Sequence, residues 1–95
     1  MQERDEYIKK LNEKLKKLDE KVDEWSNKLK EYSGKAKEEL KAKIESLRSE
    51  RKDIDNFIKK LQNTTSETWK ELKEKTDKLM KSVKTKYDEL VKKMK

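Results

Sequence analysis

The side chains that could support catalysis in this chain are carboxylates, lysines and tyrosines. Neighbouring carboxylates occur at Glu38 and Glu39 and again at Asp53 and Asp55, and pairs of this kind can act in general acid–base catalysis. That role needs a pocket that raises the pKa of one carboxyl group, whereas both pairs stand among lysines in strongly charged segments. We therefore predict that these carboxylates are not catalytic and that the protein is not an enzyme.

Two residue types that carry much of enzyme and metal chemistry are missing. The chain has no cysteine and no histidine, which excludes disulfides, thiolate nucleophiles, sulfur-ligated zinc and the usual general base. We expect no catalytic, cofactor-binding or metal-binding residues, no cofactor and no small-molecule substrate. The triplet Asn63-Thr64-Thr65 has the spelling of a glycosylation site, but no secretory signal follows Met1, so we interpret it as a helix break.

Composition limits the protein to a small number of classes. Only 29% of the 95 residues are apolar, 52% are charged, and there is no proline. Such a chain is either a coiled coil or disordered, and the regular spacing of its apolar residues favours the coiled coil. We predict one all-α domain over residues 1–95. The absence of a signal segment and of a long apolar run predicts a cytoplasmic protein.

The apolar residues follow two different helical periods. In the first third they recur every third or fourth position, which is a heptad seam: Ile8, Leu11, Leu15, Leu18, Val22, Trp25, Leu29, Tyr32 and Ala36. In the last third they recur every eleven residues, as at Leu61, Leu72, Val83 and Met94. Eleven residues make three helical turns, so this hendecad stripe stays on one helix face.

Two positions interrupt the helical pattern. Gly34 is the only glycine, and four polar residues with good capping side chains stand together at 63–66. Since a single glycine without proline is more often tolerated than helix-breaking, we predict a long helix over 1–62 with a weak point at Gly34, then a second helix over 66–94. On this interpretation Gly34→Ala should stabilise the protein. The alternative is a bundle of three antiparallel helices over 4–32, 36–62 and 66–94.

The apolar stripes need partners, because an isolated helix in water is only marginally stable. Self-association supplies them most simply, so we predict a homo-oligomer with the protein itself as partner. Subunit number and helix direction stay open. The predicted core and oligomer seam consists of Ile8, Leu11, Leu15, Leu18, Val22, Trp25, Leu29, Tyr32, Leu40, Ile44, Leu47, Ile54, Ile58, Leu61, Trp69, Leu72, Leu79, Val83, Tyr87, Leu90 and Met94.

The charge of the chain suggests an alternative role. The formal net charge is +7, with the excess after Gly34, and the 64–95 segment is lysine-rich and amphipathic. Such a helix can bind anionic membrane or nucleic acid. However, its lysines alternate with glutamates at helical spacing, and threonines interrupt its apolar face. We therefore favour a non-enzymatic structural or interaction protein that acts through self-association, with membrane or nucleic-acid binding as the alternative.

Three segments resemble a small prokaryotic coiled-coil family described as stress-response or uncharacterised proteins. They are Tyr7-Ile8-Lys9-Lys10-Leu11, Leu47-Arg48-Ser49-Glu50-Arg51 and Thr65-Ser66-Glu67-Thr68-Trp69-Lys70-Glu71-Leu72-Lys73. The family usually has glycine at the position of Ser66 and a continuous alanine-rich helix at the position of Gly34. The resemblance implies an all-helical cytoplasmic assembly with a link to stress, and it implies no catalytic residue.

Overall fold

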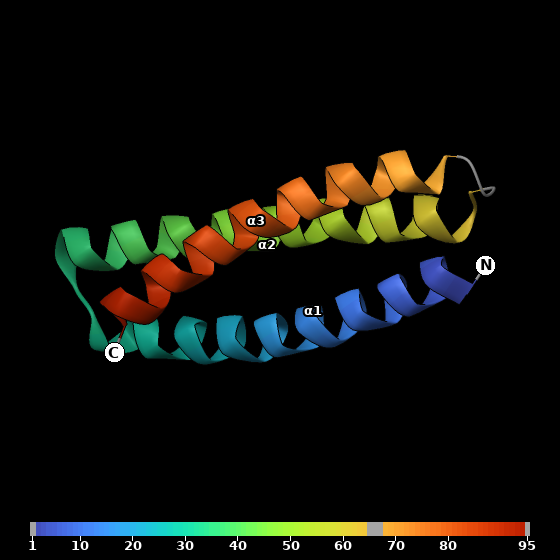
Figure 1. Cartoon of the computed structure of the whole chain (residues 1–95). Coiled ribbons are helices and arrows are strands. Elements are labelled where there is room, and N and C mark those ends of the chain that lie inside the picture. Colours follow the sequence, from blue (N-terminus) through green and yellow to red (C-terminus); the bar gives the residue numbers. More distant parts are fainter. Residues whose placement is uncertain (1, 65–67, 95) are drawn as a thin grey trace.

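A computed structural model describes residues 2–64 and 68–94 of the chain, and this part is helical. Helix α1 (Gln2–Lys28) is followed by a short 3-10 turn η1 (Leu29–Glu31), helix α2 (Gly34–Gln62) and helix α3 (Trp69–Lys93). Successive helices run in opposite directions in a bundle with extents of 50 × 18 × 18 Å (Figure 1). The described residues contain no strand. The predicted all-α helical bundle is therefore confirmed.

The predicted long helix over 1–62 is wrong, because the chain reverses direction at Gly34. Tyr32 and Ser33 are extended, and Gly34 has a φ of +62°, in the left-handed region. Glycine enters this region without the penalty of about 1–2 kcal/mol that a Cβ imposes. The turn folds α2 back onto α1, so the apolar stripes of the two helices cover each other. The three-helix alternative therefore describes the chain.

The second predicted break is confirmed at Asn63 and Thr64, which follow the end of α2. Asn63 donates a side-chain hydrogen bond to the carbonyl of Lys59 at 3.0 Å, and the Thr64 hydroxyl donates to the carbonyl of Leu61 at 3.0 Å. Both bonds satisfy carbonyls of the last turn that have no partner within the helix. The predicted start of the second helix at residue 66 falls within residues 65–67, outside the described part of the chain.

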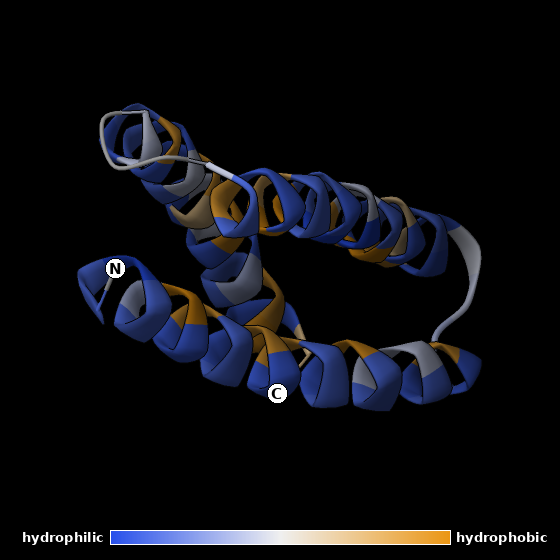
Figure 2. Ribbon diagram, turned by 90° about the vertical axis from the view of Figure 1, so that its right-hand side faces the viewer, coloured by the Kyte–Doolittle hydropathy of each residue, from blue (hydrophilic) through white to orange (hydrophobic). Residues whose placement is uncertain are grey.

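The bundle buries its apolar residues between the three helices. Apolar ribbon segments turn toward the inside and hydrophilic segments toward the outside (Figure 2). The buried apolar side chains are Ile8, Leu11, Leu15, Leu18, Val22, Trp25, Leu40, Ile44, Leu47, Ile54, Ile58, Leu61, Trp69, Val83, Leu90 and Met94. Leu29, Tyr32, Leu72, Leu79 and Tyr87 are partly buried against this core. Each helix thus finds its packing partners within one chain.

Candidate interaction surface

The carboxylates considered above for acid–base chemistry lie on the surface. Glu38, Glu39, Asp53 and Asp55 are all exposed, and Asp55 forms an ion pair with Arg51 of its own helix. Within residues 2–64 and 68–94, no group of three or more acidic side chains is placed to hold a metal ion. No helix in these ranges is long and apolar enough to cross a membrane.

The α1/α2 side of the bundle is closed by arginines of α2. The Arg51 guanidinium donates to both carboxylate oxygens of Asp19 on α1, at 3.0 and 3.2 Å. One turn earlier, Arg48 donates to the hydroxyl of Ser26 at 2.7 Å. A planar guanidinium suits this two-point contact, which fixes the register of α1 on α2.

Part of the α2/α3 side is closed by a polar cluster. Lys86 of α3 donates to Glu50 and, at 2.8 Å, to the hydroxyl of Ser46, both on α2. Ser82 donates to the same carboxylate oxygen of Glu50 at 3.0 Å. The side chain of Glu50 is only 16% exposed, so this pair is better shielded from water than an ordinary surface ion pair. The cluster ends at Ser82, and the seam between Ser82 and the α2/α3 turn is lined by both apolar and charged side chains.

The α1/α3 side is held together at its two ends. Near the N-terminus, the Tyr7 hydroxyl donates to Asp77 at 2.6 Å, and the Tyr7 ring lies 6.5 Å from that of Trp69. Burial raises the pKa of Tyr7, and the hydrogen bond to Asp77 adds to this shift. At the other end, the rings of Trp25 and Tyr87 are 5.2 Å apart.

Between these aromatic contacts lies a groove of about 650 Å³, which we call the lysine groove. Its apolar wall includes Leu18, Met80, Val83 and Tyr87, and its charged residues are Lys14, Lys17, Asp77, Lys81, Lys84 and Asp88. Of the residues that line this groove, only Asp77 makes a hydrogen bond between α1 and α3, which it accepts from Tyr7, and none makes an ion pair between these helices. The middle of this side is therefore open and carries an excess of positive charge.

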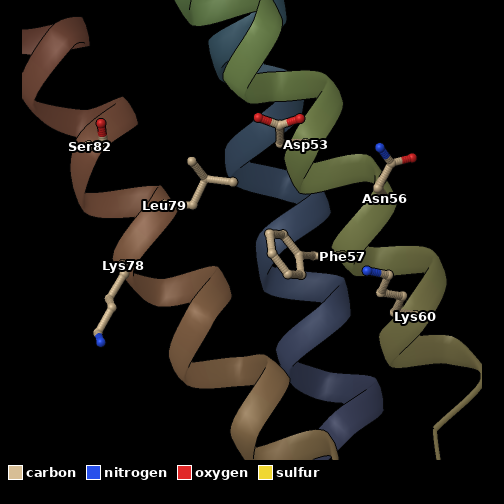
Figure 3. Close-up of a pocket in the computed structure, with 7 residues that line it drawn as sticks. All are labelled: Asp53, Asn56, Phe57, Lys60, Lys78, Leu79 and Ser82. Carbon is tan, nitrogen blue, oxygen red and sulfur yellow. The ribbon is translucent and has the colours of Figure 1, made fainter.

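A second groove, of about 540 Å³, lies on the α2/α3 side between the polar cluster and the turn. We call it the Phe57 groove, and its lining residues are Asp53, Asn56, Phe57, Lys60, Lys78, Leu79 and Ser82 (Figure 3). Phe57 and Leu79 point toward each other from the two helices. The Lys60 ammonium lies 5.6 Å from the centre of the Phe57 ring, a cation–π contact. This groove combines apolar side chains with charges of both signs.

Phe57 differs from every other large apolar side chain in the described part of the chain. The others belong to the buried core or pack against it, whereas Phe57 is half-buried and does neither. The seam prediction omitted Phe57, although Ile54, Phe57 and Leu61 are spaced i, i+3 and i+7. One signal was available: Asp53, Phe57 and Lys60 are spaced i, i+4 and i+7, which places them on one helix face.

Comparisons of the chain with models of protein families, with curated proteins and with solved structures found no match. The resemblance to the prokaryotic coiled-coil family therefore stays a prediction.

Proposed function

We propose that this is a non-enzymatic helical interaction protein that acts through self-association, as a structural or protective element. The observation that carries the proposal is Phe57. Phe57 is half-buried and outside the core, so covering its remaining exposed surface with a second surface lowers the free energy. The resemblance noted above supports a link to stress.

The fold determines what kind of self-association is proposed. Since the core is buried within one chain, folding of the bundle does not require a second copy. Association then occurs between folded bundles and covers a small part of the surface. Contacts of that size are typically weak and reversible, so the fraction of dimer depends on protein concentration.

Sedimentation equilibrium over a wide range of concentrations tests this proposal. At physiological salt, the average mass should rise from that of the 11.5 kDa monomer as the concentration approaches the millimolar range. A monomer mass throughout the range would overturn the proposal. Circular dichroism on the same samples should show unchanged helicity, because the helices exist before association.

The lysine groove favours a second candidate function, which is binding of anionic membrane or nucleic acid. Trp69, Val83 and Leu90 of α3 are buried in the core, so α3 cannot insert into lipid without leaving the bundle. Contact would instead be made by lysines of the intact fold, such as Lys81 and Lys84, and electrostatic binding of this kind weakens strongly with salt.

Binding to anionic vesicles and to a single-stranded oligonucleotide, measured at low and at physiological salt, tests this second candidate. Lys81→Glu combined with Lys84→Glu should abolish binding if the lysine groove is the site. Binding that is unchanged in this variant, or absent even at low salt, would contradict it.

A further inference from the structure

We propose that two copies of this chain associate through their Phe57 grooves, related by a two-fold axis that runs across the helices, so that α2 of one copy lies antiparallel to α2 of the other. This inference rests on the proposed self-association and names its surface. The argument starts from the spacing of charges on α2.

Asp53 and Lys60 lie on either side of Phe57 along the same helix face. Seven residues separate the two charges, which is about 10.5 Å along an α-helix, and Phe57 is next to their midpoint. All three side chains line the Phe57 groove. A two-fold axis across the helix at Phe57 exchanges the two ends of this stretch. Asp53 of each copy is then placed opposite Lys60 of the second copy, and the two Phe57 rings meet at the axis.

The charges are free to make these contacts. Asp53 and Lys60 are exposed, and neither forms an ion pair within the described part of the chain. The Lys60 ammonium lies over the Phe57 ring, 5.6 Å from the ring centre, on the face of α2 that the second copy would cover. Pairing with Asp53 of the second copy would satisfy both charges and cover the two phenylalanines, a self-complementary arrangement that a two-fold interface requires.

Other pairings of the same bundle are electrostatically worse. Because α2 and α3 are antiparallel, a two-fold axis along the helices would bring Lys60 near Lys78 of the second copy and leave Asp53 opposite Ser82. If two copies instead met through their lysine grooves, both facing surfaces would carry an excess of positive charge. Like charges across an interface disfavour association. The crosswise axis at Phe57 is the arrangement that matches opposite charges.

Charge exchange tests the proposed surface. In Asp53→Lys the two contacts become lysine against lysine, and in Lys60→Asp they become aspartate against aspartate. The self-association of each variant should therefore be weaker than that of wild type by a factor of about ten or more. When the two variants are mixed, each lysine meets an aspartate, and association should return to the wild-type level. The double variant Asp53→Lys/Lys60→Asp should also associate like wild type.

The control is Glu20→Lys, which makes the same change of charge on α1, outside the groove, and should associate like wild type. Circular dichroism should give wild-type helicity for each variant, since all three positions are exposed. A monomeric wild-type protein would overturn the proposed function itself. Association of wild type that both single variants retain, or that mixing does not restore, would overturn only this surface.

Discussion

Replacing Gly34 with alanine should destabilise the bundle. Gly34 has a φ of +62°, and a Cβ built on it meets no atom within 4 Å, so the whole effect comes from the backbone. The left-handed conformation costs an alanine about 1–2 kcal/mol. In the opposite direction, alanine lowers the conformational entropy of the unfolded chain, which stabilises the folded state by about 0.4–1 kcal/mol. The net expectation is a loss of about 0.5–1 kcal/mol, which lowers the melting temperature by roughly 2–8 °C in a domain of this size.

Urea and thermal denaturation followed by circular dichroism measure this change. Asparagine tolerates positive φ better than alanine, so Gly34→Asn should lose less stability than Gly34→Ala. Ala42→Gly, at an exposed position inside α2, calibrates the ordinary cost of a helix glycine at about 1 kcal/mol. If Gly34→Ala instead raised the melting temperature, the chain would pass through residue 34 as a continuous helix, and the antiparallel packing of α1 and α2 would be refuted.

Three further substitutions probe the interior and the sides of the bundle. Tyr7→Phe removes the 2.6 Å hydrogen bond to Asp77 and should cost about 1 kcal/mol in urea denaturation at neutral pH. Because the pKa of Tyr7 is raised in the folded chain, this difference should shrink as the pH rises past the ordinary tyrosine value of 10.0, and a constant difference would contradict the assignment. Thr76→Val should stabilise by about 0.5–1 kcal/mol, since the fully buried hydroxyl bonds only to a carbonyl of its own helix; a lower melting temperature would show that this bond matters. Arg51→Lys loses the two-point contact with Asp19 and should cost about 0.5–1 kcal/mol, and a cost that persists in about 1 M salt would argue against an electrostatic origin.

The core was predictable from the sequence because it depends on spacing. Residues such as Leu11, Leu15 and Leu18 repeat at intervals that keep them on one helix face, and an apolar face has to be covered by something. The same rule gave the eleven-residue stripe with Val83. All four of these side chains are buried, as the period predicts. Spacing does not say whether the covering helix belongs to the same chain.

The topology depended on one backbone angle that spacing does not encode. Gly34 is compatible both with a continuous helix and with a left-handed turn, and the local propensities of Ser33 and Lys35 favoured the helix. In the folded chain, the turn is stabilised by contacts distant in sequence, such as that of Arg51 with Asp19. A contact of this kind between α1 and α2 exists only after the chain has reversed direction, so it cannot be predicted from the residues around Gly34.

The candidate surfaces depended on where polar contacts between helices occur. Lysine is abundant on all three helices, yet Lys86 is held by Glu50 while Lys60 contacts only a ring. Each groove is bounded by one such contact, that of Tyr7 with Asp77 or that of Ser82 with Glu50, and its other lining residues make no polar contact between helices. The polar cluster of α2 and α3 ends at Ser82, which itself lines the Phe57 groove, and Phe57 lies beyond it toward the α2/α3 turn. An ion pair extending that cluster to position 57 would cover Phe57 without altering the core, so the exposure of this side chain and the stability of the fold depend on different residues.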